Sequence, residues 1–458
     1  MQEKTETMYT NYYFIGIGGI GMSAIARYFK HRGFHVSGYD RTPSALTHAL
    51  EQEGIAIHYE DDVTAIPQDI AHTFVIYTPA IPKELGELQY VQAHGYALCK
   101  RSQALGEIAR GQECLAVSGS HGKTTTSTLL AHILTQSGEG CNAFLGGISK
   151  NYGSNLLLSP NPVLVAEADE FDRSFLRLFP HIAVVTATDA DHLDIYGDRS
   201  HLLEAFGQFT SQVDTDGAVI VKQGVEVPLE NTTAKVWRYA YDQPCDFFAS
   251  DIQPLEKGRF DFTLNHPGGR IEHCTIGIPG WVNVENAVAA SAAALLHGTA
   301  PVKIREALAT FQGVRRRFDI HIDNPCFAYV DDYAHHPNEI RASISSLRNI
   351  FPGRKITGIF QPHLYTRTRD FASDFADALS GFDSLIMLPI YPAREEPIPG
   401  ISAETIFDKV TLADKILLPE EQLLDYLRTH ELDCLVTLGA GDVDRFGESI
   451  ETLLKSRL

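Results

Sequence analysis

Short apolar runs, glycine turns and amphipathic helices alternate along this chain. In the first hundred residues a strand is predicted at Tyr12–Ile15, followed by a glycine-rich turn at Gly16–Gly21. The helix after the turn ends at Gly33, and its apolar face is formed by Ile20, Ala24, Ile25 and Tyr28. Further strands are predicted at Phe34–Tyr39 and Phe74–Tyr77. This order is typical of an α/β unit with a parallel sheet.

The same alternation restarts after the first hundred residues. Cys114–Val117 is a predicted strand, and a helix is expected from Lys123 until Gly138 ends it. Two further buried strands are predicted at Pro162–Ala166 and Ile182–Thr186. Residues 215–278 then change to short alternating strands with Gly, Pro and Asp turns, which predicts a β-rich elaboration of this second block.

A third α/β block follows Arg315–Arg317, a basic stretch that we interpret as a hinge. Its predicted strands are Phe327–Val330, Lys355–Phe360, Ser384–Pro389 and Cys434–Leu438. We therefore predict an α/β protein with three domains in series. These are a Rossmann-like N-terminal domain (1–108), a central α/β domain with a β-rich elaboration (109–314) and a Rossmann-like C-terminal domain (315–458).

Composition and charge narrow the function classes. Of the 458 residues, 44% are hydrophobic and 21% are charged, which is ordinary for a folded globular protein. The formal charge is −20, and the only dense basic cluster is Arg315–Arg317. Because a nucleic-acid partner requires a concentrated basic surface, we expect none. An acidic protein can still bind phosphate where backbone amides and a few cations converge.

The chain has no segment of the secretory or membrane-spanning type. Its first residues, MQEKTETMYT, hold no apolar stretch, and no run approaches the roughly 18 apolar residues of a membrane helix. The cysteines are odd in number, scattered and without a CxxC pair: Cys99, Cys114, Cys141, Cys245, Cys274, Cys326 and Cys434. We expect reduced thiols in a cytoplasmic protein without a membrane partner, either a monomer or a homodimer.

A phosphate-binding loop is predicted where the strand Cys114–Val117 turns into the next helix. The segment GSHGKTTT spans 119–126, and its candidate ATP-binding residues are Gly119, Ser120, His121, Gly122, Lys123, Thr124 and Thr125. Glycines let amides approach phosphate oxygens, Lys123 would contact the β- and γ-phosphates, and the Thr124 hydroxyl would hold a metal ion. The spacing GxxGKT is shorter than the usual GxxxxGKT, so an ordinary glycine turn is the alternative. The second block is therefore a predicted P-loop domain.

A second candidate diphosphate site is the turn GIGGIG, which matches GxGxxG through Gly16, Gly18, Gly19 and Gly21. The motif predicts a diphosphate at the N-terminus of the following helix, but it does not identify the ligand. A nicotinamide cofactor with Asp40 on its ribose fits, and so does a UDP-linked substrate. A tight turn without a ligand is the third interpretation.

Acidic residues follow two strands of the second block. Glu167, Asp169, Glu170 and Asp172 come after Pro162–Ala166, and Glu167 is favoured as a Mg²⁺ ligand because it lies closest to the sheet. The segment DADHLD (189–194) follows the next strand, and His192 is a candidate second metal ligand. A solvated acidic turn and a structural histidine are the respective alternatives.

The third block places polar residues at the ends of three strands. They lie in DDYAHHP (331–337), in FQPH (360–363) with Arg367 nearby, and in GAGD (439–442). Strand C-terminal ends are the ligand edge of an open α/β sheet. Pro337 suits the first position of a helix, and the adjacent His335 and His336 cannot both point the same way. We expect at most one of these histidines to reach a substrate.

Together these segments resemble the Mur ligases. The resemblance runs in the family's order through GIGGIGMS (16–23), YTPAIP (77–82), GSHGKTTT (119–126), EADEFDRSFL (167–176), DHLDIYGD (191–198), RRF (316–318), DDYAHHP (331–337), FQPHLYTRT (360–368) and LGAGD (438–442). It implies one domain for a UDP sugar, one for ATP and one for an amino acid. The implied reaction uses ATP and Mg²⁺ to join L-alanine to UDP-N-acetylmuramate through an acyl phosphate.

The resemblance also implies residue roles. The implied catalytic residues are Lys123, Glu167 and His192, with Thr124, Glu167 and His192 as metal ligands. Further ATP contacts are implied for Asn283, Asn286, Arg317 and Asp332. The UDP sugar is expected at Gly16, Gly18, Gly19, Gly21, Asp40, Thr78 and Ala80. Contacts to alanine are expected from Tyr333, His335 and Arg367.

The chain departs from the family pattern in two places. The motif G-x-H-N-x-x-N carries Val282 instead of histidine but keeps Asn283 and Asn286. Leu364 stands where some relatives have arginine, so contacts to the alanine carboxylate rest more heavily on Arg367. Residues 187–221 contain no lysine, so the carbamylated lysine of other Mur ligases is not expected here.

Three other functions remain as alternatives. The nearest is a recycling ligase that attaches an intact tripeptide to the same UDP sugar. A nicotinamide-dependent oxidoreductase would use GIGGIG but would leave GSHGKTTT without a purpose. A catalytically inactive UDP-sugar-binding regulator would not need Lys123, Thr124 and Glu167.

Overall fold

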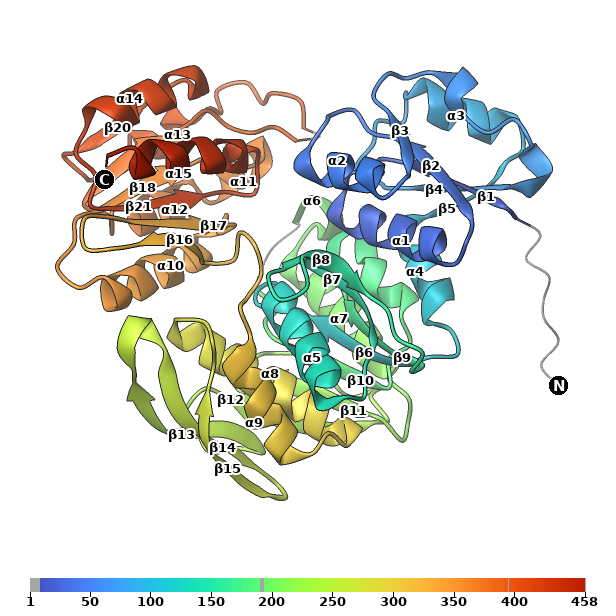
Figure 1. Ribbon diagram of the computed structural model, residues 1–458, viewed down its shortest axis with the longest axis horizontal. Coiled ribbons are helices and arrows are strands. Elements are labelled where there is room, and N and C mark those ends of the chain that lie inside the picture. Colours follow the sequence, from blue (N-terminus) through green and yellow to red (C-terminus); the bar gives the residue numbers. More distant parts are fainter. Residues whose placement is uncertain (1–8, 190–192, 394, 458) are drawn as a thin grey trace. The chain divides into compact units, whose positions relative to one another are not determined.

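The computed structural model describes residues 9–189, 193–393 and 395–457. Figure 1 shows an α/β protein, and the described residues form three β-sheets of five, ten and six strands. Each sheet is built from a different section of the chain, as the alternation of apolar runs and helices predicts. Among these described residues, no helix is both long enough and apolar enough to cross a membrane.

The first sheet is parallel, with the strand order β3-β2-β1-β4-β5. Its strands are β1 Asn11–Ile15, β2 His35–Tyr39, β3 Ala56–His58, β4 Thr73–Tyr77 and β5 Ala97–Lys100. Its helices are α1 Ile20–His31, α2 Ala45–Gln52, α3 Gly86–Ala93 and α4 Arg101–Ala109. The chain leaves β1 on one side to form β2 and β3 and on the other to form β4 and β5. The C-terminal ends of β1 and β4 therefore flank the point where ligands bind in such sheets.

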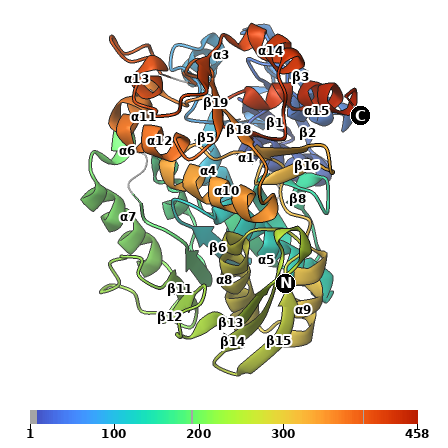
Figure 2. The same ribbon diagram turned by 90° about the vertical axis from the view of Figure 1, so that its left-hand side faces the viewer.

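The middle sheet has the order β15-β14-β13-β12-β11-β10-β6-β9-β7-β8. Its strands are β6 Glu113–Ser118, β7 Asn142–Ser149, β8 Ser154–Leu157, β9 Val163–Glu167, β10 Ile182–Val185, β11 Ala218–Lys222, β12 Lys235–Ala240, β13 Phe247–Pro254, β14 Phe260–His266 and β15 Gly269–Thr275. The associated helices are α5 Lys123–Ser137, α6 Leu193–Tyr196, α7 Arg199–Ser211, α8 Trp281–His297 and α9 Pro301–Thr310. The predicted β-rich elaboration continues the edge of this sheet as β12–β15 (Figure 2).

The third sheet has the order β16-β17-β21-β18-β19-β20, and only its edge strand β16 is antiparallel to its neighbour among the described strands. Its strands are β16 Asp319–Asp323, β17 Ala328–Asp332, β18 Ile356–Phe360, β19 Ser384–Met387, β20 Lys415–Leu417 and β21 Cys434–Leu438. Its helices are α10 Pro337–Ile350, α11 Tyr365–Asp370, α12 Ala372–Leu379, α13 Glu404–Phe407, α14 Leu423–Thr429 and α15 Gly447–Lys455. Pro337 starts α10, as predicted.

The first sheet and most of the middle sheet belong to one compact unit, residues 1–251, 262–274 and 285–311. One hydrophobic cluster runs through this unit, from Phe14 and Ile25 around α1 to Phe206 on α7. The third sheet belongs to a second unit, with residues 252–261, 275–284 and 312–458. The boundaries expected at 108/109 and 314/315 remain predictions.

Candidate active site

The loop between β6 and α5 has the backbone that a phosphate loop needs. Gly119 has φ +131°, and a Cβ there would lie 2.3 Å from Thr186 Oγ1, so only glycine fits. Gly122 caps α5 in the left-handed region, at φ 80°. The loop is fixed to the end of β10 because Ser120 N donates to Ala187 O at 3.0 Å and Thr186 Oγ1 donates to Ser118 O and His121 O. The N-terminus of α5, where helix amides point outward, suits an anion.

Lys123 lies at the first position of α5 and is paired with a buried carboxylate. Its Nζ is 2.9 and 2.8 Å from the two carboxylate oxygens of Glu170 and donates to Gly119 O at 2.7 Å. The Glu170 residue is 1% exposed. Burial alone would lower the pKa of Lys123, but the charges of Glu170, Asp169 and Glu167 raise it above its ordinary value. The ammonium is therefore charged throughout the physiological range.

Glu167, at the end of β9, has the features of a cation ligand. Its buried Oε2 has no hydrogen-bond partner among the described residues, and the same holds for the buried Oγ of Ser118 on the adjacent β6. Register pairing places Val117 of β6 opposite Glu167. A buried carboxylate oxygen without a partner is costly, and Mg²⁺ prefers oxygen ligands. The residues present here therefore fit a magnesium ion.

Strand β10, the next strand after Glu167 in the chain, is followed by the segment DADHLD (189–194), which contains the second predicted metal ligand, His192. His121 Nε2 lies 3.3 Å from Asp189 Oδ2, and the Asp189 carbonyl accepts from Ser120 Oγ at 2.9 Å. These contacts join Asp189 to the phosphate loop. His192 lies outside the described residues, so its role as a metal ligand stays a prediction.

Both asparagines of the G-x-H-N-x-x-N motif lie in the first two turns of α8. Asn286 is buried next to the phosphate loop: its Oδ1 accepts from Thr126 Oγ1 at 3.3 Å and would lie 2.9 Å from a Cβ at Gly122. Asn283 Nδ2 donates to the Pro279 carbonyl at 2.6 Å. Asn286 therefore packs against the phosphate loop at Gly122, and Asn283 bonds to Pro279, which precedes the start of α8.

The first glycine turn closes at the ends of β1 and β4. Gly16 N and Ile17 N both donate to Tyr39 O, and Gly18 N donates to Asp40 Oδ2 at 2.7 Å. Asp40 Oδ1 accepts from Thr42 N at 3.2 Å. Among the predicted UDP-sugar residues, Thr78 packs against Gly16, and Ala80 N donates to the Thr78 hydroxyl at 3.4 Å. The structure therefore brings these residues together, with Asp40 bound to the turn itself.

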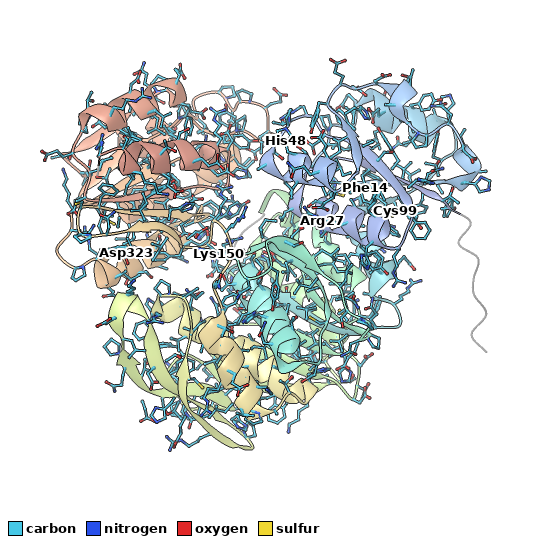
Figure 3. All side chains as sticks on the ribbon, in the orientation of Figure 1. Phe14, Arg27, His48, Cys99, Lys150 and Asp323 are labelled. Carbon is cyan, nitrogen blue, oxygen red and sulfur yellow. The ribbon has the colours of Figure 1, made fainter. Side chains whose placement is uncertain are left out.

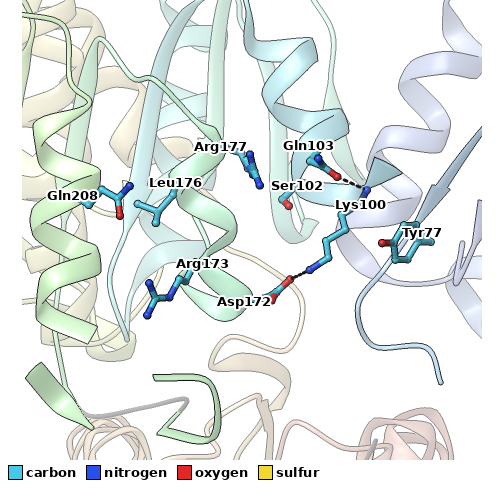
Figure 4. A pocket seen from close by; sticks show the side chains of 9 residues that line it. All are labelled: Tyr77, Lys100, Ser102, Gln103, Asp172, Arg173, Leu176, Arg177 and Gln208. Atoms are coloured by element: carbon cyan, nitrogen blue, oxygen red, sulfur yellow. Dashed lines mark hydrogen bonds and ion pairs between the residues drawn. The ribbon is translucent and has the colours of Figure 1, made fainter. Parts of the chain in front are cut away.

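A polar cavity of about 570 Å³ lies within the same compact unit, beside the ends of β4 and β5 (Figure 4). Lys100 crosses it to reach Asp172, with 2.8 Å between Nζ and Oδ2. Asp172 and Arg173 both have left-handed backbones, at φ 52° and 53°. The remaining lining residues are Tyr77, Ser102, Gln103, Leu176, Arg177 and Gln208. Two consecutive left-handed residues are strained, and such strain gathers at functional sites.

In the second unit, the residues predicted to bind the substrate amino acid lie near the ends of strands. The Tyr333 ring lies beneath the guanidinium of Arg317 at 4.5 Å and packs edge-on against His335 at 5.2 Å. His335 in turn packs edge-on against His363, whose Nδ1 lies 3.4 Å from Arg367 Nη1. Arg317 itself lies between two left-handed residues, Arg316 and Phe318. Arg317, which is predicted to contact ATP, thus lies next to the residues that are predicted to bind the amino acid, at one edge of this sheet.

Two neighbours of this cluster have defined structural roles. His336 caps α10, where its Nδ1 accepts from Asn338 N at 3.4 Å, while His335 Nδ1 bonds to the Tyr333 carbonyl. The adjacent histidines therefore have different hydrogen-bond partners. That at most one of them reaches a substrate stays a prediction. Burial raises the pKa of Asp332, at the end of β17, to about 6, despite a hydrogen bond from Phe318 N.

Sequence reasoning missed the most direct partner of Lys123. It singled out Glu167 from a run of four acidic residues, whereas Glu170 carries the ion pair. The signal was present, because Glu170 stands in the same run, but spacing alone did not separate a cation ligand from a lysine partner. The structure gives these two carboxylates different surroundings, paired for Glu170 and partly unpartnered for Glu167.

Comparisons with known proteins agree with this geometry. Three family models match in order: "Mur ligase family, catalytic domain" over residues 11–113, "Mur ligase middle domain" over 117–294 and "Mur ligase, glutamate ligase domain" over 316–441. The solved UDP-N-acetylmuramate–alanine ligase of Thermotoga maritima superposes with a TM-score of 0.82 at 26% identity, covering 96% of this chain and 99% of that one. A murein peptide ligase from Psychrobacter arcticus shares the fold, with a TM-score of 0.72 at 21% identity over 97% of this chain and 98% of its own.

Curated sequences give a stronger likeness. The UDP-N-acetylmuramate–L-alanine ligase of Parabacteroides distasonis is 50% identical over 453 residues, which are 97% of each chain. That of Porphyromonas gingivalis strain W83 is 49% identical over 451 residues, 97% of this chain and 99% of its own. The three domain models in family order and half-identity over almost the full length leave one conclusion: the chain belongs to the Mur ligase family.

Proposed function

We propose that this protein uses ATP to join L-alanine to the lactyl carboxylate of UDP-N-acetylmuramate, a step of peptidoglycan precursor synthesis. The observation that carries the proposal is the match, over 97% of the chain, to proteins named UDP-N-acetylmuramate–L-alanine ligase. The geometry supports it, because a phosphate loop, a cationic lysine paired with a buried carboxylate, and a partly unpartnered carboxylate lie in one unit. We place the reaction in the cytoplasm, where ATP and UDP-linked precursors occur, and expect a monomer or homodimer.

The chemistry requires the carboxylate to be activated first. A carboxylate is a poor acyl donor, so one of its oxygens attacks the γ-phosphorus of ATP and ADP leaves, which gives an acyl phosphate. In this protein the Lys123 ammonium would leave Glu170 for the β- and γ-phosphate oxygens and neutralise their charge. The amides of the loop from Gly119 to Gly122 would hold the phosphates in line.

A magnesium ion would be held by Glu167 and the Thr124 hydroxyl, with His192 as a further ligand. When bound, the ion supplies positive charge that offsets the charge of the transferring phosphoryl group. The unpartnered Oε2 of Glu167 supports this assignment.

The second step needs the amino acid in the third block. The Arg367 guanidinium suits the alanine carboxylate, because a planar guanidinium matches a carboxylate in two hydrogen bonds. Tyr333 and His335 would enclose the small side chain and the amine. The amine attacks the acyl carbon, phosphate leaves, and the nitrogen loses a proton, so that an amide remains.

The nearest competitor is ligation of an intact tripeptide to the same sugar. Among solved structures, the alanine ligase superposes with a TM-score of 0.82 at 26% identity and the murein peptide ligase with 0.72 at 21%. Phosphate release measured with UDP-N-acetylmuramate and either L-alanine or the tripeptide tests this choice. We expect turnover with L-alanine to dominate, and faster turnover with tripeptide would overturn the assignment.

A further inference from the structure

The hairpin of β7 and β8 lies between an element of the first glycine turn and an element of the candidate metal site, both in the first unit. On one side it lies against α1, the helix that follows the first glycine turn (Figures 1 and 2). On the other side it lies beside β9, which ends at Glu167. Both contacts fall within the same compact unit. The hairpin is therefore placed to set one site relative to the other.

Asn155 on β8 makes the contact with α1. Its Nδ2 donates to Ile20 O at 2.6 Å and to Ser23 Oγ at 2.9 Å. Its Oδ1 accepts from Arg27 Nη1 at 2.5 Å, and Figure 3 labels Arg27 on α1. The asparagine is 0% exposed. One buried side chain thus binds three positions over the first two turns of the helix.

These contacts reach the end of α1 that the glycine turn forms. Gly19 is the N-cap of α1, and no side chain of the described residues caps it. Ile20 is the first residue of the helix, directly after the cap. The amides that would receive a diphosphate therefore lie within one residue of the carbonyl that Asn155 binds. Moving this carbonyl would move the anion site.

On the partner strand of this hairpin, β7 packs tightly against the candidate metal ligand. A Cβ on Gly146 would lie 2.1 Å from Glu167 Oε2 and 2.4 Å from its carboxyl carbon. Only a glycine permits this approach. The position of the Glu167 carboxylate is therefore limited by β7, the strand that pairs with the strand carrying Asn155.

Apolar packing alone does not fix α1 along its axis. Tyr28 packs on Phe144 of β7, with 5.7 Å between ring centroids, within the hydrophobic cluster of this unit. Burial of this kind is non-directional, so it tolerates a small slide or rotation of the helix. Hydrogen bonds depend on distance and angle, and those of Asn155 remove this freedom.

We propose that Asn155 is a positioning residue for the ligation reaction. Through the β7–β8 hairpin it aligns the diphosphate turn of the first domain with Glu167 and the phosphate loop of the second. The carboxylate of the bound UDP sugar is thereby presented to the γ-phosphate of ATP. This inference rests on the proposed function, and it assigns to Asn155 no direct contact with either substrate.

The substitution Asn155→Asp tests this role. It keeps an oxygen for Arg27 but replaces the donating amide with an oxygen that faces Ile20 O. We expect kcat for L-alanine ligation to fall by about 10- to 100-fold, because a misplacement near 1 Å can cost about 10²-fold. The dissociation constant of UDP, measured by calorimetry, should stay within about threefold of wild type, because the glycine turn itself is intact. The KM for ATP should not change.

Two further variants keep the test decisive if Asn155→Asp folds poorly. Ser23→Ala removes one of the two acceptors without burying a charge, and we expect a smaller fall in kcat of about two- to fivefold. Asn142→Asp is the matched control, because Asn142 lies on the same hairpin and donates to Gln112 Oε1 and Asn161 O, away from α1. It should leave kcat unchanged at a similar cost in thermal stability.

The outcomes separate the possible failures. A folded Asn155→Asp variant with wild-type kcat would overturn the proposal, as would a Ser23→Ala variant with unchanged kcat where the first variant does not fold. A parallel loss of UDP affinity and kcat would also overturn it, because Asn155 would then belong to the substrate site. Absence of ligation by the wild-type protein would instead refute the proposed function.

Discussion

The two glycine turns of this molecule share a backbone plan but differ in what surrounds them. Each follows a parallel strand and opens a helix, α1 after Gly16–Gly19 and α5 after Gly119–Gly122. The second turn is followed at once by Lys123, which is paired with the buried Glu170, and lies near the unpartnered oxygen of Glu167. In the first turn the acidic residue Asp40 instead accepts the Gly18 amide.

The difference indicates two kinds of phosphate chemistry. The first turn offers mainly amides and a helix N-terminus, which bind a diphosphate without changing it. The second adds a cation, Lys123, and a place for a metal ion, which phosphoryl transfer requires. A glycine turn thus predicts where phosphate binds, while its charged neighbours predict whether phosphate reacts.

The largest effect is expected at the cation that distinguishes the second turn. Lys123→Met should lower kcat by about 10²- to 10³-fold, the usual cost of removing one charge-stabilising donor. It should also leave the Glu170 carboxylate buried without its partner, which destabilises the fold by about 3–5 kcal/mol. Steady-state ligation and urea unfolding measure the two effects.

The double variant Lys123→Met/Glu170→Gln separates these losses. Neutralising the carboxylate should recover most of the stability but none of the activity. If the double variant recovered ligation, Lys123 would serve the fold and not the phosphoryl transfer.

The helices behind the two turns also differ, because α5 carries a buried histidine. His132 Nε2 lies 3.1 Å from Ala307 O, and its Nδ1 lies 2.9 Å from the Tyr152 hydroxyl. Burial lowers the pKa of His132 to about 4, although the Ala307 hydrogen bond opposes this shift. The unfolded chain, with an ordinary histidine pKa near 6.5, therefore binds more protons than the folded one between these two values.

Stability should accordingly be fully present above pH 6.5 and fall as pH drops towards 4, by about 3 kcal/mol in total. Urea unfolding at pH 7 and pH 5 measures this. His132→Gln should remove much of the difference while losing some stability at pH 7. A variant that kept the wild-type pH dependence would assign it to other groups.

Much of this contrast follows from sequence, because glycine turns, caps and apolar runs are local signals. The strands at β1, β4, β6 and β9 lie where apolar runs predict them. Strands β3 and β5 were not predicted, since they are only three and four residues long and their residues are partly buried or exposed.

The pairing of charges could not be predicted in the same way. Four acidic residues stand within 167–172, and which one meets Lys123 depends on the left-handed turn at Asp172 and Arg173 and on the Tyr196 hydroxyl, which donates to Glu170 O. Asn155 meets Ile20 across 135 positions of sequence. Such contacts arise from the packing of whole elements, which no local pattern contains.

A smaller effect is expected at the metal carboxylate, which only the second turn has. Glu167→Gln keeps the shape but removes the charge that holds a cation. We expect the Mg²⁺ concentration for half-maximal activity to rise by about 10- to 100-fold, with the KM for the UDP sugar nearly unchanged. Titrating activity with Mg²⁺ measures this, and Asp172→Asn serves as a control within the same acidic run. An unchanged Mg²⁺ requirement would remove Glu167 from the metal site.

The smallest effect is expected at Asp40, where the first turn holds its own acidic residue. Both carboxylate oxygens are used, by the amides of Gly18 and Thr42. Asp40→Asn can keep only one of these bonds, and that bond becomes neutral. The loss of about 1 kcal/mol predicts a rise of about fivefold in the KM for the UDP sugar, with the KM for ATP unchanged. Because the aspartate shapes the turn, free UDP should lose affinity to the same extent as the complete sugar nucleotide. If affinity for the sugar nucleotide fell while that for UDP did not, Asp40 would contact the sugar, and the first turn would no longer be a site of amides alone.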